Sequence, residues 1–326
     1  MDTKFYNHSL LSLLSVILCL LIVSCTSKGN SSEKTEEIDE GIRVVDGRLV
    51  NGHGEEIYGK HDNYTFGYKG DYILVSDYKY NSDYDRTDTL NGILSATGEE
   101  ILPCKYDFYT YSNGYIRLYD PIGRKEGMMT PNLKIIVPCK YSEAIIKSDD
   151  YIECITIREG KRYGKLDMDG NVLVPCEYNF IVLRNNEEFD GFFLKAGYAY
   201  VLSDHGRGLY SMKEHKEVVP PKFRLDETYE EFIGVRKGEN FGIYSYSGVE
   251  VVPCRYKFIM LVGNYFYAST ESDFYDSLSD SYNMTEFDVF IDDGEFDRTQ
   301  HIGGSELASL CRRSKKSWYK KWSEYY

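Results

Sequence analysis

Short apolar runs separated by turn residues fill the chain between residues 41 and 300. The segment around Gly164 shows the pattern. We expect a strand at 164–166, a turn at 167–171 and a return strand at 172–174 that Pro175 ends. Asp, Gly and Asn in the turn tolerate positive φ, and proline cannot donate a hydrogen bond to a β-ladder. Runs this short, bounded by turn residues, predict β-hairpins rather than helices.

The hairpin pattern recurs, with a glycine at its start, a proline eleven residues later and an aromatic residue three residues after the proline. Four copies keep this spacing, a fifth is one residue longer, and a weaker copy at 54–57 has lost the proline. The glycine, proline and aromatic residue of the five copies are Gly92, Pro103 and Tyr106; Gly127, Pro138 and Tyr141; Gly164, Pro175 and Tyr178; Gly208, Pro220 and Phe223; and Gly242, Pro253 and Tyr256.

A second element lies between successive copies and opens a further short strand with an aromatic and an apolar residue. Its instances are Asp71-Tyr72-Ile73, Gly114-Tyr115-Ile116, Asp150-Tyr151-Ile152, Gly191-Phe192-Phe193, Glu231-Phe232-Ile233 and Asn264-Tyr265-Phe266. We therefore expect about six units of three or four strands, the first one degenerate. One such sheet is marginally stable alone, so neighbouring units must stack to bury their faces.

The predicted fold class is all-β, built from tandem antiparallel units over 41–300. We favour a β-propeller-like arrangement, with an open twisted array of the units as the alternative. Closure of a propeller requires the weak first unit to pair with the strands around 287–291.

The last segment, 301–326, differs from the repeats and predicts a basic amphipathic helix that Ser305 caps. Its stripe at three- and four-residue spacing consists of Leu307, Leu310, Cys311, Ser314, Trp318, Trp322 and Tyr325. Six basic and two acidic residues leave this tail with four positive charges. We expect the helix to pack on the open end of the array, and a membrane-surface or partner-docking arm is the alternative.

The N-terminus carries a targeting signal. Residues 10–23 are mostly apolar, too short for a comfortable membrane span, and Lys4 precedes them. The run ends at Ser24-Cys25 and resembles the bacterial lipobox, which implies a signal peptide at 1–24 and acylation of Cys25. Residues 25–40 are polar and predict a flexible tether. The resemblance implies a cell-envelope protein, lipid-anchored to the outer membrane on its periplasmic or surface face.

The repeat pattern resembles the WG (KWG) β-repeat family, whose units read Trp-Gly, two strands around a turn, then Ile-Pro-x-x-Tyr. The resemblance covers roughly residues 90–260 well and 41–90 weakly. The tryptophan is absent, and its positions hold Asn91, Glu126, Tyr163, Arg207 and Phe241. The family implies a non-enzymatic envelope or secreted protein, and Pro-Cys with a lipobox resembles Bacteroidetes lipoproteins.

The net charge and the absence of known site motifs reduce the number of function classes that fit this chain. The 52 acidic and 38 basic residues leave a net charge of −14, which disfavours nucleic acid as a partner. We expect no cofactor, metal or catalytic site, because no CxxC, HxxxH or nucleophile motif occurs. The histidines His53, His61, His205, His215 and His301 are predicted to be surface residues. Cys104, Cys139, Cys176 and Cys254 share one repeat position and are predicted to be reduced and buried.

These observations predict an envelope-anchored, non-catalytic binding or scaffold lipoprotein. Its partners are the membrane, through the lipid, and a protein or glycan that the β-repeat surface binds. The alternative is a glycan-processing enzyme that uses paired carboxylates, with Asp149-Asp150 and Asp292-Asp293 as candidates.

Overall fold

The protein is seen here as a computed structural model, which describes residues 41–67, 71–81, 85–147, 152–184, 187–189, 192–229, 231–271, 284–314 and 316–317. The predicted signal peptide, Cys25 and the tether lie outside the described residues. The chain divides into two compact bodies. The first comprises the residues up to Ile145 together with Ile155–Gly160, and the second comprises Ile146–Cys154 together with all residues from Lys161 onward.

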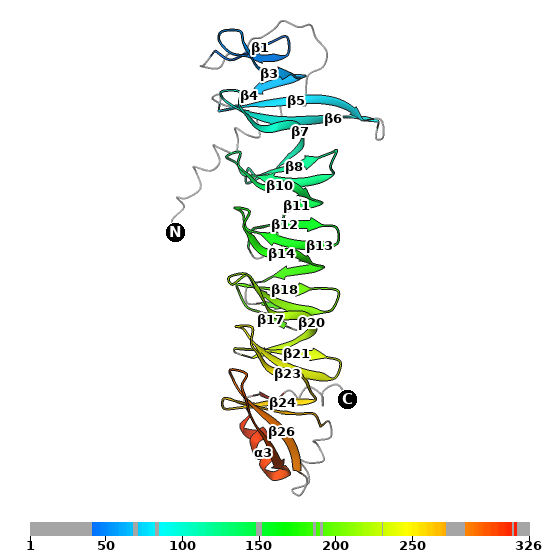
Figure 1. Ribbon diagram of the computed structural model, residues 1–326, viewed down its shortest axis with the longest axis vertical. Coiled ribbons are helices and arrows are strands. Elements are labelled where there is room, and N and C mark those ends of the chain that lie inside the picture. The colour runs from blue at the N-terminus through cyan, green and yellow to red at the C-terminus, as the bar shows by residue number, and fades with distance from the viewer. Residues whose placement is uncertain are drawn as a thin grey trace, which may run out of the picture. The chain divides into compact units, whose positions relative to one another are not determined.

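The first body holds two antiparallel sheets (Figure 1). A three-stranded sheet has the order β1-β2-β3, and a seven-stranded sheet has the order β10-β9-β8-β7-β6-β5-β4. Their bounds are β1 Arg43–Val45, β2 Arg48–Val50, β3 Glu56–Lys60, β4 Asn63–Phe66, β5 Tyr72–Asn81, β6 Arg86–Ser95, β7 Glu100–Thr110, β8 Ile116–Asp120, β9 Lys125–Met129 and β10 Ile135–Tyr141. β11 (Glu143–Lys147) and β12 (Cys154–Glu159) follow at the division between the bodies.

The second body begins with the hairpin β13–β14 and continues with a seven-stranded sheet, β15-β18-β19-β20-β21-β22-β23. A two-stranded sheet, β16-β17, and a five-stranded sheet, β27-β26-β25-β24-β28, complete it. The bounds are β13 Arg162–Leu166, β14 Val172–Tyr178, β15 Phe180–Leu183, β16 Glu187–Phe189, β17 Phe192–Leu194, β18 Tyr198–Leu202, β19 Arg207–Ser211, β20 Lys216–Tyr229, β21 Phe232–Lys237, β22 Asn240–Ser245, β23 Glu250–Tyr256, β24 Phe258–Val262, β25 Tyr265–Ser269, β26 Met284–Ile291, β27 Phe296–Gly303 and β28 Lys316–Ser317.

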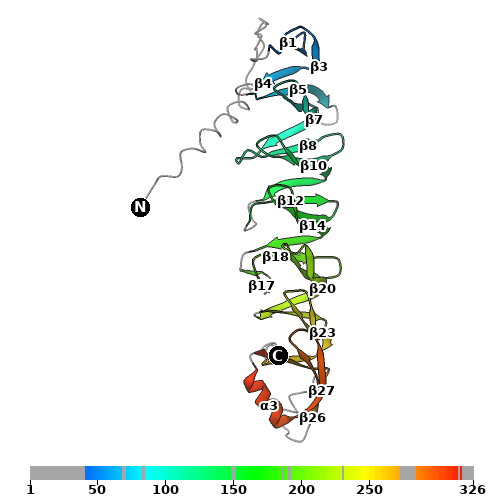
Figure 2. The ribbon, with the colours of Figure 1, turned by 60° about the vertical axis from the view of Figure 1, so that its left-hand side comes forward.

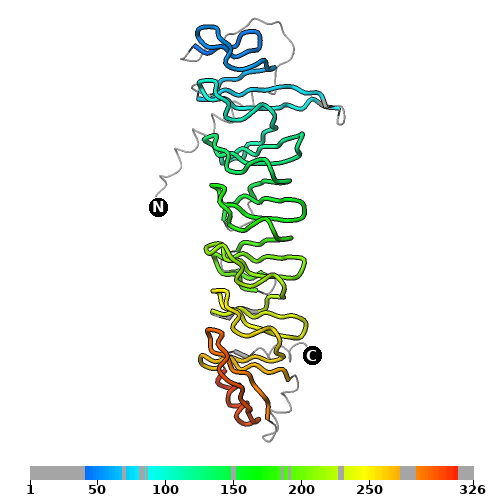
Figure 3. Tube along the Cα trace, viewed as in Figure 1, coloured from blue at the N-terminus to red at the C-terminus, as the bar shows by residue number. Residues whose placement is uncertain are grey.

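Three successive strands make one repeat unit, and the chain then runs into the next unit (Figure 3). In two units the third strand itself continues into the next unit. In β7, the residues up to Tyr106 pair with β6, whereas Asp107–Thr110 pair with β8. β20 does the same, because it pairs with β19 up to Phe223 and with β21 from Arg224. Among the described strands, seven such triplets follow in chain order: β1–β3, β5–β7, β8–β10, β12–β14, β18–β20, β21–β23 and β25–β27. The last triplet lacks the Pro-Cys motif, which is why the sequence indicated about six units.

Each repeat glycine lies beneath a bulge in the opposite strand. Asn91 pairs with Tyr106 and Ile93 with Leu102, so a single residue of β6, Gly92, faces the three residues 103–105 of β7. The bulged Pro-Cys backbone therefore passes close over the glycine. A β-carbon built on any of the five glycines would lie 2.5–2.9 Å from the nearest atom of that strand. Only glycine fits a backbone approach this close.

The bulge corrects one prediction from the sequence. Pro175 does not end its strand, because β14 continues to Tyr178 and the register shifts between Lys165↔Val174 and Tyr163↔Tyr178. Proline is tolerated inside this strand because it lies in a bulge, where no ladder hydrogen bond is required of it. The predicted turn at 167–171 is confirmed: Asp167 accepts hydrogen bonds from the backbone N–H groups of Asp169 and Asn171, and Gly170 has φ +88°.

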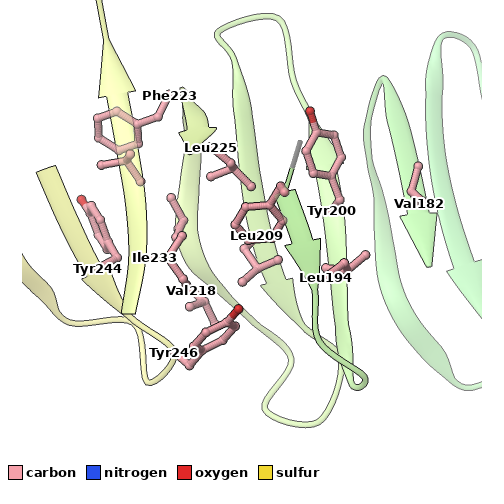
Figure 4. Close-up of a cluster of buried hydrophobic side chains, with 13 residues drawn as sticks. Val182, Leu194, Tyr200, Leu209, Val218, Phe223, Leu225, Ile233, Tyr244 and Tyr246 are labelled. Carbon is pink, nitrogen blue, oxygen red and sulfur yellow. The ribbon is translucent and has the colours of Figure 1, made fainter. Parts of the chain in front are cut away.

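Four of the aromatic residues that close a repeat motif, Tyr106, Tyr178, Phe223 and Tyr256, pack against the next unit. In the second body Tyr178 meets Tyr210, Phe223 meets Tyr244 and Tyr256 meets Phe290, with ring centroids 5.8–6.2 Å apart. In the first body Tyr106 joins the cluster that contains Met129, which takes the same place two residues after the repeat glycine. Figure 4 shows Phe223 and Tyr244 beside Ile233 and Leu225 in one buried cluster. Neighbouring units thus share buried hydrophobic clusters within each body.

The all-β fold of tandem antiparallel units is confirmed, and no sheet of the described residues is closed. The pairing that a closed propeller requires is not formed, because β26 pairs with β25 on one edge and with β27 on the other. The open sheets agree with the alternative, an open array. The element at Phe192 also differs from expectation: it forms the small β16–β17 hairpin, and β18 is the strand that pairs in the repeat.

The C-terminal helix forms over part of its predicted length, as α3, Gly304–Arg313 (Figure 2). Gly303 rather than Ser305 takes the N-cap position, without a side-chain cap, and β27 extends through the predicted domain boundary at 301. Leu307 and Leu310 are buried among residues of β24, β25 and β26, which agrees with the packing interpretation. The helix ends before Ser314, whose hydroxyl donates to the Leu261 carbonyl at 3.0 Å, and Trp318, Trp322 and Tyr325 lie outside the described residues.

We predict that Gly92→Ala destabilises the protein by about 1–3 kcal/mol, because its β-carbon would lie 2.6 Å from the Cys104 backbone nitrogen. Gly59→Ala in β3 is the matched control, since nothing lies within 4 Å of its β-carbon. Urea unfolding followed by circular dichroism gives both values. Equal free energies of unfolding for the two variants would contradict the close-approach explanation.

Candidate functional site

A surface pocket of about 600 Å³ lies in the second body, at the bulge of β20. Glu177 and Glu217 supply acidic groups, Lys222 and Lys237 supply basic groups, and Tyr178 and His205 complete the polar lining. The repeat fold places these groups together, because Lys222 follows the two prolines of the bulge and Tyr178 is the aromatic residue of the preceding motif.

Hydrogen bonds hold the pocket wall in place. The Ser203 hydroxyl donates to the Pro221 carbonyl at 2.6 Å and so anchors the bulge. The Tyr178 hydroxyl donates to Glu217 Oε1 at 3.0 Å. Burial, and then the Glu217 carboxylate, raise the pKa of the Tyr178 phenol, so it remains a hydrogen-bond donor at neutral pH. A pocket with fixed donors, acceptors and both charge signs suits a polar ligand such as a sugar or a peptide.

A second cluster lies in the first body, where His61, Asp77 and Cys104 meet. His61 Nδ1 is 3.0 Å from Asp77 Oδ2, and the ligand atoms of all three residues lie within 4.8 Å of one another. His61 lies between β3 and β4, Asp77 in β5 and Cys104 at the bulge of β7. Each of the three side chains is half-buried.

Aromatic rings enclose the imidazole of His61. The Tyr58 ring stacks on it with centroids 5.3 Å apart, and the Tyr64 ring meets it edge-on at 5.9 Å. Burial, and then Asp77, raise the pKa of the Cys104 thiol to about 12, so this group is protonated at neutral pH. Its sulfur donates to the Leu90 carbonyl at 3.3 Å.

Two other repeat cysteines, Cys176 and Cys254, make the same kind of contact with a backbone carbonyl. Cys176 Sγ lies 3.3 Å from the Arg162 carbonyl and Cys254 Sγ lies 3.4 Å from the Asn240 carbonyl, each two residues before the repeat glycine. None of the six cysteines among the described residues forms a disulfide bond. The prediction that the four repeat cysteines are buried is wrong in degree, because each is half-buried and only Cys154 is fully buried.

The other candidate residues from the sequence, the remaining histidines and the acidic pairs, do not lie together in one site. His53, His215 and His301 are exposed, as predicted, and His301 Nε2 lies 3.5 Å from Glu286. His205 is exposed but lines the pocket. Asp292 and Asp293 form an exposed turn after β26 and do not line the pocket, and Asp149-Asp150 lies outside the described residues.

Sequence reasoning missed the His61 cluster, because its members are 16 and 27 residues apart and match no motif. Aligning the first unit with the later repeats does show an unusual residue at the position of His61. His61 follows the turn glycine Gly54 by seven residues, as Lys105 follows Gly98. Asp77 pairs with Leu90, whose carbonyl the Cys104 sulfur contacts. Placing the degenerate first unit on the repeat would have brought the three residues together.

The repeat units match a known protein family over part of the chain. The sequence model of the WG containing repeat family matches residues 92–118. This segment runs from Gly92 through Pro103 and Tyr106 into β8, and thus spans one bulge and the start of the next unit. The expected family resemblance is therefore confirmed for this unit. No curated protein matches the chain in sequence.

Several solved structures show weak likeness to the chain. A eukaryotic initiation factor is 6% identical, with a TM-score of 0.21 over 90% of this chain and 91% of its own. Hsv2 of Kluyveromyces lactis is 11% identical, with a TM-score of 0.20 over 70% and 73%. PorZ of Porphyromonas gingivalis, a surface component of the type-IX secretion system, is 8% identical, with a TM-score of 0.19 over 83% and 45%. Scores this low carry no argument about fold or function.

No helix within the described part of the chain has the length and apolar character needed to cross a membrane.

Proposed function

We propose that this chain is a non-catalytic binding or scaffold lipoprotein of the cell envelope, which presents its β-repeat surface to a protein or glycan partner. The observation that carries this proposal is the pocket at the β20 bulge, which the repeat fold itself creates. Stacked short strands offer an extended surface, and repeat proteins commonly bind through such surfaces.

The electrostatics of the pocket support a polar ligand. Lys222 and Lys237 are exposed cations on its wall, and Glu177 and Glu217 face the same space. Exposed aromatic side chains elsewhere in the second body, including Phe180, Phe193 and Phe296, add apolar area that a sugar face or a protein can cover. The net charge of −14 disfavours nucleic acid as the partner.

The lipobox supports the envelope location. Ser24-Cys25 follows an apolar run in the manner of bacterial lipoproteins, and acyl chains on Cys25 would hold the repeats at the outer membrane.

An alternative function has a specific observation in its favour. Glu177 and Glu217 line one pocket beside Tyr178, and paired carboxylates are the machinery of glycoside hydrolysis. Against it, the Tyr178 hydroxyl already donates to Glu217, so this carboxylate is held within the wall. We therefore retain binding as the function and treat hydrolysis as an outcome of the test.

We predict that cells expressing the full chain incorporate labelled palmitate into it and that it fractionates with the outer membrane. Cys25→Ser removes the only acylation site that we propose, so the label and the membrane fraction are both lost. Cys254→Ser is the control, because it also removes one thiol and lies within a repeat. Label retained by Cys25→Ser would contradict the anchor.

We predict that the double variant Lys222→Ala/Lys237→Ala loses about tenfold in affinity for the partner that wild type captures from crosslinked envelopes, equivalent to about 1.4 kcal/mol. Lys213→Ala/Lys216→Ala is the control, since it removes the same charge at exposed positions outside the pocket. Equal loss in both pairs would contradict pocket binding. Cleavage of a glycan that disappears in Glu177→Gln or Glu217→Gln would replace the binding proposal with the enzymatic one.

A further inference from the structure

We propose that His61, Asp77 and Cys104 form a binding site for a divalent metal ion of the zinc class. This site lies in the first body, apart from the pocket, and the inference goes beyond the proposed binding function. It rests on the meeting of three different ligand types from three separate segments.

The ligand chemistry selects the class of ion. An imidazole nitrogen, a carboxylate oxygen and a thiol sulfur are the three side-chain groups that bind zinc in proteins. Calcium and magnesium prefer sites made of oxygen atoms, so a sulfur and a nitrogen ligand disfavour them. Three protein ligands leave one coordination position for water or for a group of a partner.

The distances are close to those that coordination requires. Bonds of about 2.0–2.3 Å to a tetrahedral ion place ligand atoms roughly 3.3–3.6 Å apart. His61 Nδ1 and Asp77 Oδ2 are 3.0 Å apart, and Cys104 Sγ lies within 4.8 Å of a ring nitrogen of His61 and a carboxylate oxygen of Asp77. Coordination would require side-chain rotations that bring the three atoms to a common centre. The exposed fractions of the His61 and Asp77 side chains, 18% and 35%, leave an entry path.

The surroundings hold the ligands in position. Tyr58 and Tyr64 fix the plane of the imidazole. The backbone N–H of Asp62 donates to Asp77 Oδ1 at 3.1 Å, which leaves Oδ2 directed at His61. Partners of this kind orient metal ligands in known sites. The Asp62 carboxylate accepts from the Tyr78 N–H at 2.8 Å and adds a nearby negative charge.

The other repeat cysteines show that the cluster is not a property of the repeat. Cys139 lies near the carboxylate of Asp120, which takes the place of Asp77, but no histidine joins them. At Cys254 the same place holds Lys237, a cation. Within the described residues, only the Cys104 position gathers three possible ligands.

Binding requires the Cys104 thiol to release its proton to solvent as the sulfur–metal bond forms. The positive charge of the ion drives this step, as it does wherever a thiolate ligates a metal. The bound ion would then tie the degenerate first unit, through His61, to β5 and β7. This unit lacks the Pro-Cys bulge of its neighbours and gains a link that they do not need.

The test uses the full chain and Co²⁺ as a spectroscopic probe for Zn²⁺. We expect one Co²⁺ per chain, a thiolate-to-cobalt charge-transfer band in the near ultraviolet, and loss of the band when Zn²⁺ is added. Cys104→Ser should abolish the band. His61→Gln and Asp77→Asn should weaken Co²⁺ binding by more than about 100-fold, because loss of a merely supporting residue already costs about 10–100-fold.

Cys139→Ser is the matched control, since it removes a thiol from the same repeat position beside a carboxylate. It should retain the full band. The absence of a band in wild type, a band that survives in Cys104→Ser, or equal loss in Cys139→Ser would each overturn the proposal. If Cys104→Ser fails to fold, His61→Gln tests the same proposal, because the His61 substitution leaves the β7 bulge intact.

Discussion

Packing of each repeat's aromatic residue against the next unit is the interaction on which the rest of the structure depends. A three-stranded unit cannot bury its own faces, so it needs a neighbour to supply the other side of the core. Tyr178, Phe223 and Tyr256 each reach a ring of the following unit. The bulge over the repeat glycine adds the extra residues that let the third strand cross from one unit into the next.

The repeat, its strands and its turns could be predicted from the sequence, because short apolar runs and turn residues are local signals. The role of the proline in each repeat could not be predicted from the sequence. Its effect depends on a bulge that forms only when the glycine strand lies opposite, and no local pattern shows that a β-carbon on Gly164 would lie 2.9 Å from the Cys176 backbone. A helix in the tail 301–326 is likewise predicted from the sequence, but α3 ends at Arg313, and Lys316 and Ser317 pair with β24.

The candidate sites arise where units depart from their common pattern. The pocket forms at the one bulge with two prolines, and the His61 cluster forms where the degenerate first unit meets a regular one. Neither matches a known motif, since the residues come together through strand pairing across tens of positions. The repeat backbone fixes where each side chain lies. A single different residue at such a position, such as His61 where a later repeat has a lysine, can then provide a ligand group.

A double-mutant cycle on Tyr256 and Phe290 tests the account most directly, because these rings belong to adjacent units and meet at 5.9 Å. Urea unfolding of wild type, Tyr256→Ala, Phe290→Ala and the double variant gives the coupling free energy. The account predicts about 0.5–1.5 kcal/mol, typical of an edge-to-face aromatic pair. Strict additivity of the two substitutions would show that the units do not depend on this contact.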